Sequence, residues 1–194
     1  MKKCITILLL IFIIGCKKNE INTTEKLDLV AFKKNIHSGN SFIRNDSIIS
    51  LNEKQGIYVI ERRHKQDSLV VNMKVFDNNT LFIKWNGNII WNAAGPIYIG
   101  VSTSYNEEGK IRTRDNDKKF YYPVIDLIKK LEKNYNLKIY RDKKTYFLFR
   151  DYDKVLYQVC FYKNNNIGFR VPYWIIFDGI TGNFIKEERM PLVD

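Results

Sequence analysis

The sequence predicts an α+β fold that is mostly an antiparallel sheet meander, with one main amphipathic helix (about residues 122–135) packed on the C-terminal strands. Short runs rich in β-branched and aromatic residues recur from about residue 56, and turn residues separate them, which is typical of antiparallel strands. One later segment carries apolar residues at helical spacing, with charged residues on its other side. Together these patterns favour sheets and a single covering helix.

A short helix over residues 26–35, capped by Thr23 or Thr24, is expected to precede the sheet. Loops are expected at 39–41 and 45–47, where Gly, Asn, Asp and Ser gather. The strands of this β-rich half, residues 29–115, are expected only from about residue 56 onward, at 57–60, 69–76, 81–85, 88–91 and 97–105.

The dipeptide Asn86-Gly87 stands between two of these runs. An Asn-Gly pair flanked by apolar runs is the strongest short signal for a β-hairpin, because both turn positions need a positive φ. The sequence therefore predicts a turn here. The run 97–105 alternates between bulky and small or polar residues, which indicates one buried and one wet face. The polar stretch 112–119 is expected to connect the two halves.

The C-terminal half, residues 120–190, is expected to be a helix followed by antiparallel strands. Pro123 suits the first turn of a helix, and Asn136 is expected to end it. The apolar residues between them recur at helical spacing: Val124, Leu127, Ile128, Leu131 and Tyr135. Strands are then expected at 145–149, 155–162, 169–177 and 183–187.

Residues 120–188 resemble a PepSY-type domain. In that family a turn of the form Asp-x-x-Thr-Gly joins the last two strands, and Asp178, Thr181 and Gly182 stand at those positions here. Asp and Thr side chains can cap backbone N–H groups, and Gly accepts the left-handed conformation. The resemblance implies an extracytoplasmic binding or inhibitory module rather than a catalyst.

The N-terminus follows the order of a secretory signal, because two lysines precede an apolar run over residues 5–14. As a helix this run would reach only about 15 Å, half of the roughly 30 Å hydrocarbon layer. It ends in Ile13-Ile14-Gly15-Cys16, which resembles the lipobox of bacterial lipoproteins. That family usually has Leu where Ile13 stands and a smaller residue where Ile14 stands. The resemblance implies cleavage after Gly15 and a lipid on Cys16, and the alternative is a plain secretory signal with a chance cysteine.

Residues 1–15 are thus expected to be removed, leaving a lipidated cysteine and flexible tether over 16–28 and a globular domain over 29–194. Two or three acyl chains make a stable membrane anchor. Lys17 stands where an aspartate would favour retention at the inner membrane. The expected location is therefore the outer membrane, on its periplasmic side or at the cell surface.

The charge of the chain is strongly basic. Because residues 1–15 contain two of the 32 basic residues and none of the 21 acidic ones, the remaining chain carries a net charge of about +9. Such a balance favours contact with anionic surfaces. The charges are dispersed in short clusters, however, which is typical of solvated loops. Besides the membrane reached through Cys16, the expected partner is a protein or an anionic envelope component, and nucleic acid is disfavoured.

Catalytic groups are sparse in this sequence. Of the three cysteines, Cys4 leaves with the signal and Cys16 is lipidated, so Cys160 stands alone and is expected to be a small buried hydrophobe. The two histidines lie in polar segments without a second metal ligand at helical spacing. No phosphate-binding loop, dinucleotide motif or paired cysteines occur. We therefore expect no cofactor, no metal and no catalytic site.

Carboxylate pairs keep one enzymatic alternative open, because a glycosidase needs only two such groups. The pairs lie in expected turns beside lysines: Glu107 and Glu108, Asp115 and Asp117, and Asp151 and Asp153. Acids in such turns are ordinarily just solvated. The alternative is a carboxylate-dependent envelope hydrolase.

Aromatic residues are the more suggestive feature, since Tyr and Trp are enriched in binding hot spots. Six of them are candidates for a recognition surface: Trp85, Trp91, Tyr121, Tyr122, Tyr173 and Trp174. The alternative is that they simply fill a β-rich core. The sequence favours a lipid-anchored, non-catalytic binding module, such as an immunity or inhibitor protein against a toxin or hydrolase, with a passive structural lipoprotein as a further alternative.

Overall fold

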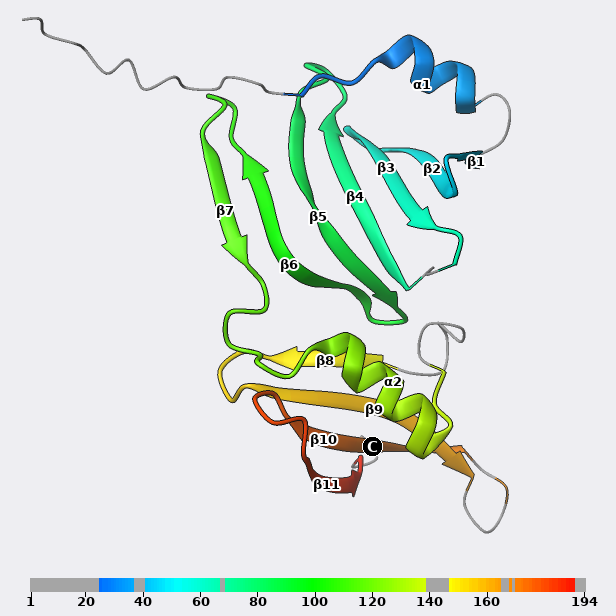
Figure 1. The fold of residues 1–194 in the computed structure, drawn as a ribbon, viewed down its shortest axis with the longest axis vertical. Helices are drawn as coiled ribbons and strands as arrows, with labels where there is room; N and C mark the ends of the chain where they lie inside the picture. Colours follow the sequence, from blue (N-terminus) through cyan, green and yellow to red (C-terminus); the bar gives the residue numbers. More distant parts are fainter. Residues whose placement is uncertain are drawn as a thin grey trace, which may run out of the picture.

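The computed structural model of the 194-residue chain describes residues 25–36, 41–66, 69–138, 147–164, 168 and 170–190. The expected signal, Gly15 and Cys16 of the lipobox, and the expected helix caps Thr23 and Thr24 lie outside the described residues. The described chain is α+β and mostly antiparallel strand, as the sequence predicts, with two sheets and two helices (Figure 1).

The larger sheet is a seven-stranded antiparallel meander in which each strand pairs with the next one along the chain (Figure 1). Its strands are β1 (Ser41–Arg44), β2 (Ser47–Lys54), β3 (Ile57–His64), β4 (Val70–Asp77), β5 (Ile83–Asn92), β6 (Gly95–Tyr105) and β7 (Ile111–Asp115). The sheet begins earlier and ends later than expected, because β1 and β2 precede residue 56 and β7 occupies part of the expected connection. All five residues of β7 are exposed, so this edge strand lacks an apolar face that the sequence could reveal.

The prediction of a hairpin at Asn86-Gly87 is wrong. β5 continues through both residues, which pair with Lys74 and Met73 of β4, although the register with β6 shifts between Asn86 and Asn88. Gly87 is needed for packing instead: a Cβ at this position would lie 2.8 Å from two ring atoms of Trp85. A glycine inside a strand commonly marks such a close approach.

The turn between β5 and β6 lies further along, where Asn92 pairs with Gly95. The Asn92 side chain holds this turn, since its Nδ2 donates to the Gly95 carbonyl (2.8 Å) and its Oδ1 accepts from the Ala94 N–H (3.0 Å). The same Oδ1 also accepts from the Leu148 N–H of the second sheet (3.3 Å). One side chain therefore fixes the hairpin and ties it to the C-terminal half.

The helix α1 (Leu29–Ile36) lies beside the first strands of the larger sheet (Figure 1). It begins later than expected because its cap is Asp28, whose Oδ1 accepts from the N–H groups of Val30 (3.1 Å) and Ala31 (3.0 Å). The α1 residue Phe32 belongs to an apolar core at this end of the sheet, together with Leu27, Leu51, Tyr58, Phe76 and Ile83.

The helix α2 (Val124–Tyr135) forms in the segment with the helical pattern. Pro123 is its N-cap residue with an extended ψ of 137°, so the helix begins one residue after it. Asn136 ends the helix in the left-handed conformation with a φ of 54°. The buried residues of α2 are four of the apolar positions that the spacing identifies: Val124, Leu127, Ile128 and Leu131.

The second sheet has four antiparallel strands in the order β11-β10-β9-β8. They are β8 (Phe147–Asp151), β9 (Leu156–Asn164), β10 (Arg170–Asp178) and β11 (Phe184–Arg189). Each lies within two residues of the strand that the sequence predicts at either end.

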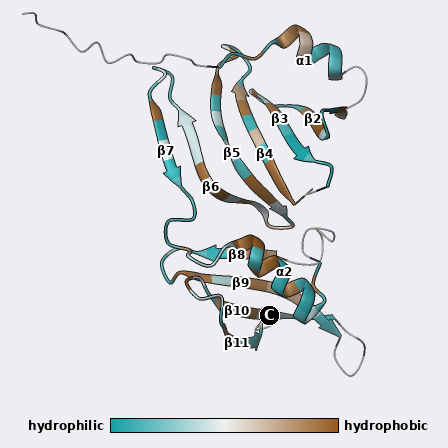
Figure 2. Ribbon diagram, viewed as in Figure 1, coloured by the Kyte–Doolittle hydropathy of each residue, from teal (hydrophilic) through white to brown (hydrophobic). Residues whose placement is uncertain are grey.

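One apolar core connects the two sheets. It contains the four buried residues of α2, residues of β8 to β10, and Ile90, Ile97 and Ile99 from β5 and β6. Figure 2 shows these hydrophobic segments in brown on α2, β9 and β10. Full burial of one such aliphatic side chain stabilises a fold by about 1.5–3 kcal/mol. The larger sheet therefore depends on the C-terminal half for part of its core.

Candidate functional site

Alternation along the strands gives the four-stranded sheet two different faces. One face turns into the shared core and includes residues that are fully buried: Tyr157, Val159, Ile175 and Phe177. An antiparallel sheet ordinarily turns its other face to water and makes it polar. Here the intervening residues of β9 and β10 are largely apolar too: Cys160, Tyr162, Pro172, Trp174 and Ile176.

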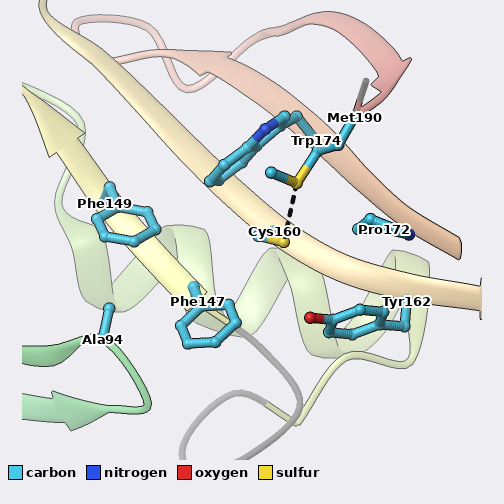
Figure 3. Close-up of a pocket in the computed structure, with 8 residues that line it drawn as sticks. All are labelled: Ala94, Phe147, Phe149, Cys160, Tyr162, Pro172, Trp174 and Met190. Carbon is cyan, nitrogen blue, oxygen red and sulfur yellow. Dashed lines mark hydrogen bonds between the residues drawn. The ribbon is translucent and has the colours of Figure 1, made fainter. Parts of the chain in front are cut away.

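A groove with a volume of about 310 Å³ opens on this outer face (Figure 3). Its walls come from β8, β9, β10 and the residue after β11, namely Phe147, Phe149, Tyr162, Pro172, Trp174 and Met190. Ala94, from the turn between β5 and β6, also lines the groove, so both sheets contribute to it (Figure 3). Phe149 and Tyr162 are 40% and 38% exposed, which is high for ring side chains in a sheet.

Strand register sets the arrangement of these rings. Trp174 on β10 stands opposite Cys160 on β9, which in turn stands opposite Phe147 on β8. The Trp174 ring meets Phe149 edge-on, with 5.7 Å between ring centroids, and the rings of Phe147 and Phe149 stack at 6.3 Å. The outer face therefore presents connected aromatic surface rather than isolated apolar residues.

Cys160 forms the floor of the groove and is 4% exposed. The prediction of a small buried hydrophobe is confirmed for this residue. Its Sγ lies 3.6 Å from Sδ of Met190 (Figure 3), and burial raises the pKa of the thiol. The groove residues include no histidine, lysine or carboxylate. This environment keeps the thiol protonated and does not activate it as a nucleophile.

The structure does not bring the six candidate aromatic residues together. Trp174 lines the groove, whereas the neighbouring Tyr173 points to the opposite face, where its ring lies 6.1 Å from that of Phe161. Adjacent residues of a strand point to opposite sides, so these two cannot share a surface. Trp85 lies on the other sheet, edge-on to Tyr98.

The remaining three candidates have separate positions. Trp91 pairs with Pro96 near the turn between β5 and β6. Tyr121 is 76% exposed in the segment before α2. Tyr122 packs inward, where its ring occupies the space that a Cβ on Gly182 would need. Of the six, Trp174 is the one that the groove includes.

The groove residues that the sequence did not single out are Ala94, Phe147, Phe149, Tyr162, Pro172 and Met190. A signal for them does exist in the strands. Both alternating sets of residues in β9 and β10 are largely apolar, which is typical of strands covered on both faces. Without a second covering layer among the described residues, that pattern indicates an exposed apolar face.

The turn motif of the PepSY resemblance is formed as expected. Oδ1 of Asp178 accepts from the N–H of Ile180 (3.0 Å) and from the N–H and hydroxyl of Thr181 (2.7 and 2.9 Å), while Gly182 has a φ of 70°. The Thr181 N–H is the main cause that holds the pKa of Asp178 below its usual range.

The same turn recurs elsewhere in the chain. Oδ1 of Asp77 accepts from the N–H groups of Asn79 and Thr80 and from the Thr80 hydroxyl, and Leu81 has the left-handed conformation. Asp151 caps residues 153 and 154, and residue 155 has a φ of 54°. Three hairpins thus have the same capped turn. The motif is a common way to close a hairpin in this chain, so it is weak evidence for membership of a family.

Three of the six candidate carboxylates are engaged in structural contacts: Asp115, Asp117 and Asp151. Oδ2 of Asp117 accepts from the Gly100 N–H (2.6 Å), and its Oδ1 lies 2.7 Å from a guanidinium nitrogen of Arg150. Asp115 caps the N–H of residue 117 (3.0 Å), as Asp151 caps its own turn. Within the described part of the chain no three His, Cys, Asp or Glu side chains come together as a metal site would require.

Comparison with family models, with curated proteins and with solved structures finds no match to this chain. Over the described ranges no helix has both the length and the apolar character needed to cross a membrane. The groove and the N-terminal sequence are therefore the observations from which a function can be argued.

Proposed function

We propose that the chain is a bacterial lipoprotein, anchored through Cys16 at the outer membrane, whose globular part is a non-catalytic binding module. The sequence Ile13-Ile14-Gly15-Cys16 at the end of a short apolar run supports the anchor. The outer face of the four-stranded sheet supports the binding role. Its concrete form is an immunity or inhibitor protein that occludes the site of an envelope-directed toxin or hydrolase.

The aromatic groove is the single observation that carries the binding role. Exposed, connected aromatic surface on a sheet is costly in water, and it marks protein interaction sites. Its occupant in this proposal is an apolar segment of a protein partner. The groove contains no charged residue that would select an ionic ligand.

The proposal includes α2 as the cover of the four-stranded sheet, in the manner of a PepSY-like unit. Two contacts of α2 and one of the segment just before it support this arrangement. The ring of Tyr135 lies 6.1 Å from that of Phe177, Nζ of Lys130 donates to the Gly182 carbonyl (2.7 Å), and the Tyr122 N–H donates to the Gly179 carbonyl (3.1 Å). With the helix on the inner face, the outer face remains available to a partner.

The test of binding is a pull-down with residues 17–194, tagged at the N-terminus, from envelope and secreted fractions. We expect one protein in equimolar amount, with the Trp174→Ala and Phe149→Ala variants each losing affinity by about 30-fold, the equivalent of a hot-spot residue of about 2 kcal/mol. Tyr121→Ala is the matched control, because that ring is exposed and outside the groove. Loss of activity of the captured protein on binding would support the inhibitor form.

Two results would overturn this function. One is a partner that the groove variants and the control variant retain equally. The other is self-association of the purified domain that Trp174→Ala abolishes, because the groove would then hold a second copy of the chain.

The anchor is tested separately by labelling cells with a radioactive fatty acid. The wild-type chain should incorporate the label and the Cys16→Ser variant should not. A plain secretory signal predicts that neither form carries label and that both are released from the membrane.

A further inference from the structure

A second pocket, with a volume of about 350 Å³, lies on the seven-stranded sheet and shares no lining residue with the aromatic groove. It combines the ring pair Trp85 and Tyr98, the hydroxyls of Ser102 and Ser104, and the two arginines Arg112 and Arg114. We propose that this pocket binds an acidic saccharide, with the sugar ring against Trp85 and its carboxylate on the arginines.

Strand register brings these side chains to one face. Trp85 on β5 stands opposite Ser104 on β6, and Ser104 stands opposite Arg112 on β7. Ser102 stands opposite Arg114 in the next row with the same orientation. Residues directly opposite each other in antiparallel strands share a face. The pocket is therefore a consequence of the pairing of three strands.

The position of the aromatic part depends on Gly87, which leaves room for the Trp85 ring. A Cβ on Gly87 would lie only 2.8 Å from the end of that ring. Tyr98 meets the ring edge-on, with 5.4 Å between centroids. Trp85 is only half-buried, so part of the indole surface remains accessible. A flat, half-exposed indole is a suitable surface for the C–H face of a sugar ring.

The polar floor is rigid. The Asn116 side chain is buried, and its Nδ2 donates to the Gly100 carbonyl (3.0 Å) and to Oγ of Ser102 (3.1 Å). Oδ2 of Asp117 accepts a hydrogen bond from the Gly100 N–H (2.6 Å). Ser102 thus accepts from the protein and keeps its own proton for a ligand oxygen.

The arginines select the charge of the ligand. Neither Arg112 nor Arg114 has a carboxylate partner within the described residues, and no acidic side chain lines the pocket. The guanidinium of Arg114 lies 5.5 Å from the ring of Tyr152, which restricts it without occupying its N–H donors. Two arginines on the same face of one strand suit a carboxylate or another compact anion.

Other ligand classes fit this pocket less well. Purely apolar ligands would leave two arginines unpaired, and a metal ion would meet no acidic ligand. A nucleic-acid strand needs a basic groove along its backbone, whereas here the charges gather on one strand beside a single indole. An envelope saccharide as the natural source rests on the extracytoplasmic location proposed above, but binding in solution does not.

The test uses purified residues 17–194 and the trimer of galacturonic acid as the probe, followed by calorimetry and by tryptophan fluorescence. We expect saturable binding that the double variant Arg112→Gln, Arg114→Gln weakens at least about tenfold, the loss of one charge-assisted hydrogen bond or more. The control Arg44→Gln, Arg170→Gln removes the same charge at exposed positions outside the pocket, and it should bind like the wild type. The methyl ester of the trimer should bind at least tenfold more weakly.

Gly87→Ala tests the ring position. The backbone there accepts alanine, but the added Cβ would lie 2.8 Å from the indole and 2.9 Å from the Ser102 Cβ, so both neighbours must shift. This variant should weaken the binding of the acid and of the methyl ester alike. Trp85→Phe keeps an aromatic ring and should retain part of the affinity. Absence of binding, or equal binding to the arginine double variant, would overturn the proposal. Equally tight binding of inorganic phosphate or oligothymidylate would also overturn it, by making the pocket a general anion or nucleic-acid site. Retention of partner binding by all these variants would leave the groove and its proposed function intact.

Discussion

The guanidinium of Arg150 lies 2.7 Å from the carboxylate of Asp117, and this ion pair joins the two sheets. The Arg150 side chain is only 3% exposed, whereas that of Asp117 is 39% exposed. One guanidinium nitrogen also donates to the carbonyls of Tyr98 (3.0 Å) and Asn116 (3.2 Å), and the group lies over the ring of Phe120 at 4.9 Å. A single side chain of β8 therefore reaches β6 and the segment after β7.

Replacement of Arg150 by Met should destabilise the domain by about 3 kcal/mol. Removal of one partner of a buried ion pair costs about 3–5 kcal/mol, and the partial exposure of Asp117 places this case at the lower end. Urea denaturation at neutral pH measures the change. Arg170→Met, at an exposed position of β10, should change the unfolding free energy by less than about 0.5 kcal/mol. A similar small change for Arg150→Met would mean that the ion pair adds little to the apolar core and the Asn92–Leu148 hydrogen bond, which also join the two sheets.

Gly182→Ala should cost about 3 kcal/mol. Gly182 has a φ of 70°, and an added Cβ would lie 2.5 Å from three ring atoms of Tyr122. The backbone cost is about 1–2 kcal/mol, and overpacking adds about 1–3 kcal/mol. Gly56→Ala is a matched control, because Gly56 has a φ of 74° with no atom within 4 Å of its added Cβ. Thermal or urea unfolding should show the Gly182 variant as the less stable by at least 1 kcal/mol, and equal losses would remove any role for the contact with Tyr122.

Local signals account for the parts of the fold that could be predicted. The strands of the C-terminal half fall within two residues of their expected limits, because turn residues such as Asp151 and Asp178 cap their own backbone. The end of α2 at Asn136 is equally local. The turns and the helix end depend on a few neighbouring residues and not on the rest of the chain.

Non-local packing accounts for the failures. Asn86-Gly87 has the composition of a turn, yet Gly87 is small because the Trp85 ring lies over it. β7 was missed because both faces of an edge strand meet water, so its sequence has no alternation to detect. The aromatic groove depends on which residues of β8, β9 and β10 stand opposite each other, and Trp174 alone does not reveal that register.

The Cys160 thiol should react slowly in the folded domain. It is buried beneath Trp174 and Met190, and burial raises its pKa, so both access and the thiolate fraction are reduced. With residues 17–194 at pH 8, a disulfide reagent such as DTNB should react at least about tenfold more slowly than it does with the unfolded chain. The control is Ser41→Cys in a Cys160→Ser background, at an exposed position of β1. Equal rates for the two thiols would mean that the groove floor is open to the reagent.

Tyr157 should make the domain lose stability at alkaline pH. Burial raises the pKa of its hydroxyl to about 12, and this hydroxyl donates to the Tyr122 carbonyl at 2.7 Å. The tyrosine of the unfolded chain ionises near pH 10. Between these two pH values the unfolded chain releases the proton while the folded chain keeps it, so the unfolding free energy falls as pH rises, by about 2 to 3 kcal/mol in all.

The Tyr157→Phe variant lacks that ionisation. At pH 8 it should be less stable than the wild type by about 1 kcal/mol, because the Tyr122 carbonyl loses its donor. The difference should shrink as pH rises above about 10 and reverse before about 12, since only the wild type pays for keeping Tyr157 protonated. Urea unfolding at a series of pH values measures both curves. Tyr121→Phe, at an exposed ring, should run parallel to the wild type throughout. If Tyr157→Phe also ran parallel, the hydroxyl would have to ionise equally in both states, which its burial in the shared core opposes.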